Sequence, residues 1–108
     1  MNKPENREQG LDVSEIDKTI HEPVRLGIVA HLYALEAADA LFLKNQMGLT
    51  WGNLSTHLTR LEKIGYIEVL KEFVDRKPVT SLRLTEKGRD AFRNYREQII
   101  NLFENLPP

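Results

Sequence analysis

Cysteine is absent from the 108-residue sequence. Without a thiol the chain can form no disulfide, no thiolate metal site and no covalent intermediate at a cysteine nucleophile. Its three histidines, His21, His31 and His57, are widely separated, and no HExxH motif brings two imidazoles onto one helix face. We therefore expect no bound metal and no cofactor, and we interpret His31, on an apolar segment, as a core histidine whose ring is hydrogen-bonded.

Motifs of enzymes are also missing. The sequence contains neither a GxSxG nucleophile motif nor a glycine-rich phosphate-binding loop. Carboxylates are plentiful, but their abundance does not indicate a catalytic acid–base pair. We therefore predict that the protein is not an enzyme.

No segment is apolar for long enough to cross a membrane. The longest apolar region, residues 28–43, is interrupted by charged side chains, whereas a spanning helix needs about 20 mostly apolar residues. Residues 1–13 mix both signs of charge and lack the apolar stretch of a signal peptide. We expect them to form a flexible N-terminal arm and the protein to be cytoplasmic.

An excess of basic residues, typical of nucleic-acid-binding proteins, is missing too, because the net charge is −1. The charges are unevenly distributed, however. Residues 1–22 carry a net charge of −3, and residues 40–85 carry a net charge of +3. The chain is thus acidic at its start and mildly basic in its middle.

Capping residues predict where the first helices begin. Ser14 and Asp17 resemble a capping box at the start of a brief helix that ends near residue 20. Pro23 suits the first turn of a second helix, which runs to about residue 36. This second helix is apolar nearly all round, so we expect it to be buried on more than one side.

Two further helices are joined by a very short connection. Asp39 can cap a helix that ends at Gly48, and Thr50 can cap a helix that ends at Gly65. Because only two residues separate Gly48 from the second of these helices, we expect residues 39–64 to form a helix-turn-helix.

After this unit the periodicity of the apolar residues changes from helical to alternating. We predict a β-hairpin over residues 66–84, whose polar turn VDRKP contains Pro78, a residue that cannot donate to a strand ladder. Thr85 then caps a last helix, residues 85–106.

The last helix carries an apolar stripe with alternating intervals of four and three residues, which is typical of a coiled-coil seam. Ala91, Ile100 and Phe103 widen this surface beyond one seam. Because so small a domain has little core left to cover a broad face, a second copy of the chain is the simplest cover. The residues that we predict at this dimer interface are Phe92, Tyr95, Ile99, Leu102, Phe103 and Leu106.

The helix predicted for residues 51–64 has an unusual outer face. With Leu54, Leu58 and Leu61 inward on a helical wheel, the opposite arc carries short polar side chains and, near its end, cations. A face needed only for solubility would carry more glutamate, lysine and glutamine, which are better helix formers than serine and threonine. Asparagine and arginine can contact bases bidentately, so this face suits the major groove of DNA.

Three stretches together resemble the winged helix-turn-helix transcriptional regulators of the MarR and ArsR type: EPVRLGIVAHL, GNLSTHLTRLEKIGYI and RLTEKGRDAF. The resemblance covers about residues 17–106. It implies an α+β, mostly α fold in which residues 14–106 form one winged helix-turn-helix domain with a β-hairpin wing and a long C-terminal dimerisation helix. It also implies a homodimeric transcriptional regulator that binds double-stranded DNA sequence-specifically.

The resemblance further implies which residues contact DNA. The helix of residues 51–64 would lie in the major groove, Arg76 and Lys77 at the wing tip would touch the backbone or minor groove, and Arg25 would touch a phosphate. We expect Trp51, close to the apolar stripe, to pack against neighbouring helices. On the helix and its cap, the implied DNA contacts are Thr50, Gly52, Asn53, Ser55, Thr56, His57 and Arg60.

An alternative stays open at this stage. A winged helix can also act as a protein–protein interaction module that does not bind DNA, and the acidic N-terminal residues suit that function. Binding that weakens steeply with salt would indicate phosphate contacts instead. The sequence also leaves open whether a small molecule acts as an effector, although the missing thiols argue against metal sensing.

Overall fold

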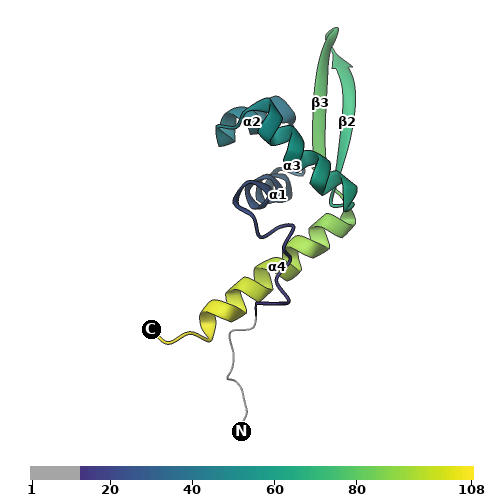
Figure 1. Ribbon diagram of the computed structural model, residues 1–108. Coiled ribbons are helices and arrows are strands. Elements are labelled where there is room, and N and C mark those ends of the chain that lie inside the picture. Colours follow the sequence, from purple (N-terminus) through teal and green to yellow (C-terminus); the bar gives the residue numbers. More distant parts are fainter. Residues whose placement is uncertain (1–12) are drawn as a thin grey trace.

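The computed structural model describes residues 13–108 (Figure 1). The predicted N-terminal arm lies outside the described residues, except for residue 13. Within these residues, four helices and a three-stranded antiparallel sheet confirm the predicted α+β, mostly helical winged-helix fold. In chain order the elements are α1 (Pro23–Leu35), β1 (Ala37–Asp39), α2 (Ala40–Met47), α3 (Trp51–Lys63), β2 (Ile67–Val74), β3 (Lys77–Leu84) and α4 (Glu86–Glu104).

The predicted caps of the helix-turn-helix are confirmed. Asp39 accepts a hydrogen bond from the N–H of Leu41 at 2.7 Å, and Thr50 Oγ1 accepts one from the N–H of Asn53 at 3.1 Å. Gly48 ends α2 with a φ of 66°, in the left-handed region that favours glycine. Gly48 and Thr50 thus shape the short connection between α2 and α3, and Asp39 stabilises the start of α2.

The brief helix expected from Ser14 and Asp17 is wrong, because residues 13–22 form turns. Asp17 Oδ1 accepts hydrogen bonds from the N–H groups two and three residues further on, at 2.8 and 3.0 Å. Glu22 then caps α1 in an extended conformation, which is the conformation favoured before Pro23. Asp17 thus stabilises a turn rather than a helix, and Glu22 stabilises the start of α1.

Strand β1 was not predicted. Its residues pair with residues 81–83 of β3, so the sheet order is β1-β3-β2. The chain turns from α1 into this strand at Glu36, whose φ is 68°. The sequence Ala-Ala-Asp has neither the length nor the β-branched residues that indicate a strand.

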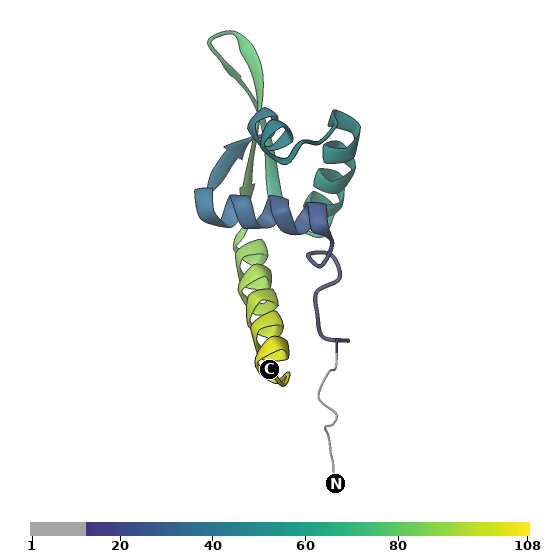
Figure 2. The same cartoon turned by 90° about the vertical axis from the view of Figure 1, so that its left-hand side faces the viewer.

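Helix α1 lies at the centre of the domain, between α4 and the helix-turn-helix (Figures 1 and 2). The prediction that it is buried on more than one side is confirmed. His31 lies on this helix and donates a hydrogen bond to the carbonyl oxygen of Gly27 at 2.7 Å, as expected for a satisfied ring. Its own fully buried residues are Ile28, Val29 and Leu32, and those of the three elements around it are Leu43, Leu54, Leu61 and Leu82.

Two parts of the molecule extend beyond this core. The hairpin of β2 and β3 projects on one side, and the far half of α4 projects on the other (Figures 1 and 2). Asp75 and Arg76, both with positive φ, form the two-residue turn of the hairpin. In residues 13–108 no helix is long and apolar enough to span a membrane.

Candidate nucleic-acid interface

Helix α3 buries its leucines and exposes its polar side chains, as the wheel predicted. Its surface is thus able to make hydrogen bonds over most of its length. Two hydroxyls on it already have partners inside the chain: Thr50 caps the helix, and Thr56 Oγ1 donates to the carbonyl oxygen of Gly52 at 2.9 Å. The exposed residues of α3 are Trp51, Gly52, Asn53, Ser55, Thr56, Thr59, Arg60, Glu62 and Lys63.

Gly52 occupies the exposed first turn of α3 without a packing reason. A Cβ at this position would meet no atom within 4 Å, and the backbone is not in the left-handed region. Glycine in a helix is less stable than alanine. No contact within the described residues therefore requires glycine at this position.

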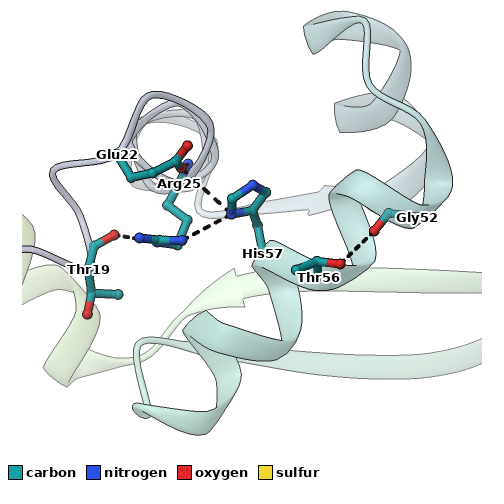
Figure 3. A network of polar contacts seen from close by, with 6 residues as sticks. All are labelled: Thr19, Glu22, Arg25, Gly52, Thr56 and His57. Carbon is teal, nitrogen blue, oxygen red and sulfur yellow. Dashed lines mark hydrogen bonds and ion pairs between the residues drawn. The ribbon is translucent and has the colours of Figure 1, made fainter.

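Arg25 and His57 face each other inside the domain (Figure 3). The side chain of His57 is only 16% exposed, and its Nδ1 accepts a hydrogen bond from Arg25 Nη1 at 3.2 Å. Arg25 Nε donates to the carbonyl oxygen of Thr19 at 2.6 Å, and Glu22 Oε1 lies 3.7 Å from His57 Nδ1. In this arrangement the two residues join α3 to α1 and to the preceding turn.

A groove of about 550 Å³ separates α3 from the wing. Ser55 and Thr59 line its α3 side, and Lys71 and Thr80, which pair across β2 and β3, line its wing side. Sequence reasoning missed Lys71 and Thr80. The sequence did contain a signal for Lys71. It follows Ile67 and Val69 at intervals of two residues, which places it on the same face of the hairpin as these two apolar residues.

Trp51 stands at the same groove and is 52% exposed. Lys44 Nζ of α2 lies 5.5 Å from the centroid of the Trp51 ring, which is a cation–π distance. The expected packing against neighbouring helices is therefore limited to this side, and half of the side chain surface is open to a partner.

The cations around α3 and the wing are available for an anionic partner. Within residues 13–108 none of them has a carboxylate within ion-pair distance, in contrast to Arg83 at the base of the wing, whose Nε donates to Glu68 at 2.9 Å. An exposed cation without a carboxylate is what phosphate neutralisation requires. The exposed ones are Arg60, Lys63, Lys71, Arg76 and Lys77, whereas Lys44 is partly buried.

The first half of α4 packs on its own chain. Tyr95 is 6% exposed, and its hydroxyl is hydrogen-bonded to His21 Nδ1 at 2.8 Å. Phe92 packs against Tyr33 of α1 with tilted rings whose centroids are 5.0 Å apart, and Ile99 and Leu102 are partly buried against the core. The predicted coiled-coil seam therefore covers this chain's own core over most of its length.

Beyond this seam α4 leaves large apolar side chains exposed. Phe103 is 63% exposed and Ile100 45%, and Leu106, two residues after the end of α4, is 40% exposed. Of the residues predicted at a dimer interface, Phe103 and Leu106 are thus open to a partner, whereas Tyr95 is occupied within the chain. Periodicity detected the apolar surface but could not tell which part the chain covers itself.

The turn segment 13–22 ties α4 to the base of the wing. Tyr66, at the start of the hairpin, donates from its hydroxyl to Asp17 Oδ2 at 2.5 Å. Burial, and then the hydrogen bond to Asp17, raise the pKa of Tyr66 to about 12.

In the described part of the chain no group of three or more histidine and acidic residues lies close enough together to hold a metal ion.

Comparison with known proteins agrees with this geometry. Residues 24–103 match a family model described as a winged helix DNA-binding domain. An uncharacterized protein of Methanocaldococcus jannaschii is 39% identical over 89 residues, which are 82% of this chain and 97% of that protein. A transcriptional regulator homologue from Pyrococcus horikoshii superimposes with a TM-score of 0.79 at 28% identity, covering 83% of this chain and 89% of that one.

A second solved structure, NadR in complex with 4-hydroxyphenylacetate, has a TM-score of 0.67 at 26% identity and covers 81% of this chain and 61% of that one. The resemblance to winged-helix transcriptional regulators inferred from the sequence is thus confirmed. The chain belongs to the winged helix DNA-binding domain family.

Proposed function

We propose that the protein is a homodimeric transcriptional regulator that binds a palindromic site, with α3 in the major groove and the wing on the backbone or in the minor groove. The observation that carries this proposal is the exposed, hydrogen-bonding face of α3 beside cations without carboxylate partners. An α-helix fits the major groove, where each base pair presents a distinct pattern of donors and acceptors.

The side chains of α3 divide into two kinds of contact. Asn53 and Arg60, both exposed, can contact base edges bidentately, and Gly52 allows the backbone to come close. Thr50, Ser55 and Thr56 complete the surface with hydroxyls that suit bases or phosphates. Specificity in this proposal rests mainly on the first group.

The wing and the groove supply contacts to phosphate. Arg76 and Lys77 stand at the tip of the hairpin, and Lys71 lines the groove between the hairpin and α3. Such contacts strengthen binding to all sequences and position the protein on the duplex. Arg25 and His57 have a different role in this proposal, because their mutual hydrogen bond holds α3 on α1.

Dimerisation through α4 accounts for its exposed apolar end. Phe103 and Leu106, with the partly buried Ile99 and Leu102, would then be covered by a second copy. A two-fold axis would present two copies of α3 to successive major grooves, about 34 Å apart on one face of the duplex.

Selection of sites from random duplex DNA at low salt, followed by footprinting, tests the proposal. We expect enrichment of an inverted repeat whose half-sites are one helical turn apart, and an affinity that falls steeply with salt. A selection that enriches no sequence, or binding that is independent of salt, would support the protein-interaction alternative. NadR is bound to 4-hydroxyphenylacetate in its structure, so small aromatic acids are the first effectors to add.

A further inference from the structure

The tip of the wing carries a large apolar side chain that the chain leaves uncovered. Phe73, near the end of β2, is 79% exposed, more than any other large apolar residue among those that the structure describes. It pairs across the hairpin with Pro78, which is also exposed. The pair therefore contributes little to the packing of the fold, and its apolar surface stays open to a partner.

Phe73 lies on the face of the hairpin that is turned towards α3. Side chains alternate between the two faces of a strand, so Phe73 shares its face with Val69 and Lys71, which line the groove beside α3. On β3 the order is the same, with Pro78 beyond the groove residue Thr80. A partner that binds along α3 and this groove therefore reaches the apolar pair next.

Cations surround the apolar pair. Lys71 precedes it on the same face, Arg76 lies in the turn and Lys77 follows the turn, and within residues 13–108 none of the three has a carboxylate within ion-pair distance. Of the two carboxylates nearby, Glu72 lies on the opposite face, and Asp75 in the turn is outnumbered by the cations. An apolar surface among cations fits a duplex, in which stacked bases lie behind phosphates.

We infer that Phe73 inserts from the wing tip into the minor groove of DNA, where it wedges between two base pairs and bends the duplex towards the major groove. This inference rests on the proposed DNA binding by α3. Phenylalanine and proline are among the side chains that enter the minor groove in this way and partly unstack a base step. Pro78 adds apolar surface opposite the ring and has no N–H that would lose its hydrogen bond to water.

The spacing along the wing fits this position. With α3 in the major groove, Lys71 at the groove beside α3 would stand over the sugar–phosphate backbone that borders the major groove. Phe73 is two residues further along the strand, which is about 7 Å at a rise of about 3.4 Å per residue. Beyond the backbone this distance reaches the adjacent minor groove, which is about 6 Å wide.

A wedge of this kind gives specificity without a hydrogen bond to a base. Pyrimidine–purine steps such as TA and CA are the easiest to kink, whereas A-tracts are stiff. The protein should therefore select a pyrimidine–purine step in each minor groove that a wing reaches, outside the bases that α3 contacts.

Bending of the selected site tests the inference. The duplex carries a fluorophore at each end, and energy transfer between the two measures the bend. Phe73→Ala is expected to lose most of the bend and to bind about ten-fold more weakly. Its thermal unfolding should match the parent because the side chain is exposed, and its slope of log affinity against log salt should be unchanged because no charge is removed.

Two further variants control this measurement. Val74→Ala shortens an exposed apolar side chain next to Phe73 but on the opposite face of the hairpin, so it should bend the duplex as the parent does. Phe73→Leu keeps a side chain that can act as a wedge, so it should retain most of the bend. Equal bending by the parent and Phe73→Ala would overturn the inference.

Exchange of the selected step gives a second measurement. In the minor groove that the wing reaches, the pyrimidine–purine step is replaced by AA, and the bases that α3 contacts are kept. The parent should bind the exchanged site several-fold more weakly, whereas Phe73→Ala should bind both sites equally. A preference for the flexible step that Phe73→Ala retains in full would also overturn the inference.

The outcomes separate this inference from the proposed function. If Arg60→Ala weakens binding to the selected site but the parent leaves the duplex straight, only the wedge is refuted. If the parent selects no site, the proposed function fails and the wedge fails with it. Binding to vesicles with one-third phosphatidylglycerol that depends on Phe73, together with a bend that does not, would assign the tip to a lipid surface and overturn the inference.

Discussion

Helices α3 and α4 are both amphipathic, but they leave different surfaces uncovered. All three leucines of α3 are buried at 9% exposure or less, and what remains outside is polar and hydrogen-bonding. On α4, Tyr95 is buried while Phe103 stays 63% exposed, so what remains outside is apolar. A polar surface of this kind suits base edges, and an apolar one suits another protein. The two helices therefore point to two different partners, DNA and a second subunit.

The same contrast holds for the glycine that each helix contains. Gly88 of α4 lies against the backbone of Tyr66, where a Cβ would collide with the carbonyl oxygen, whereas a Cβ at Gly52 of α3 would stand in open space. Gly88 is thus required by packing inside the chain. No contact inside the chain requires glycine at position 52, which suits the close approach to DNA that we propose for it.

Replacement of these glycines should give the largest effect. Gly88→Ala is expected to destabilise the fold by about 3 kcal/mol, because backbone must move to admit the methyl group. Gly52→Ala should leave stability unchanged or raise it by up to about 1 kcal/mol, and should weaken DNA binding. Urea unfolding measures the first effect and titration of the selected site the second. Equal destabilisation by the two variants would remove the contrast between the helices.

Truncation of the outer face of α3 should affect binding without affecting the fold. Asn53→Ala and Arg60→Ala should each cost about 1–3 kcal/mol of specific binding, because each removes a bidentate contact to a base. Their thermal unfolding should match the parent, since both side chains are exposed. Binding of the selected site at parental affinity by both variants would show that α3 is not the recognition helix.

Neutralisation of the wing tip should have a smaller and sequence-independent effect. Arg76→Gln with Lys77→Gln is expected to lower the slope of log affinity against log salt by about one to two units. Arg93→Gln on α4, where the parent residue pairs with Asp90, is the matched control and should keep the slope. A parental slope in the wing variant would place the hairpin away from the DNA.

Local signals in the sequence predicted most of the elements. Asp39, Thr50 and Thr85 each cap the helix that they were expected to cap, and the alternation after Gly65 predicted the hairpin. Each of these signals depends only on residues a few positions apart. Strand β1 carries no such signal, because it exists through its pairing with distant residues of β3.

The same limit applies to the candidate site: its local features were predictable, and its contacts between distant segments were not. The wheel placed Asn53 and Arg60 on the outside of α3, but it put His57 on a flank without showing that α1 covers that flank. Likewise the spacing of α4 did not show that His21 from the N-terminal turns would engage Tyr95. Which side of an amphipathic helix is covered depends on tertiary packing, and periodicity does not contain that information.

Alkaline pH should have the smallest effect on stability, through Tyr66, which lies between the end of α3 and the start of α4. Tyr66 follows α3, lies against Gly88 of α4 and donates to Asp17, and its pKa is raised to about 12 from a usual value near 10. A raised pKa means that the folded state holds the phenol proton more tightly than the unfolded state. The contribution of the Tyr66 hydroxyl to the stability of the fold is therefore complete below about pH 10 and is lost as the pH rises towards 12. Tyr66→Phe should cost about 1 kcal/mol at neutral pH, and its difference from the parent in urea unfolding should shrink above pH 10. A difference that stays constant up to pH 12 would show that this hydroxyl does not help to hold α4 to the end of α3.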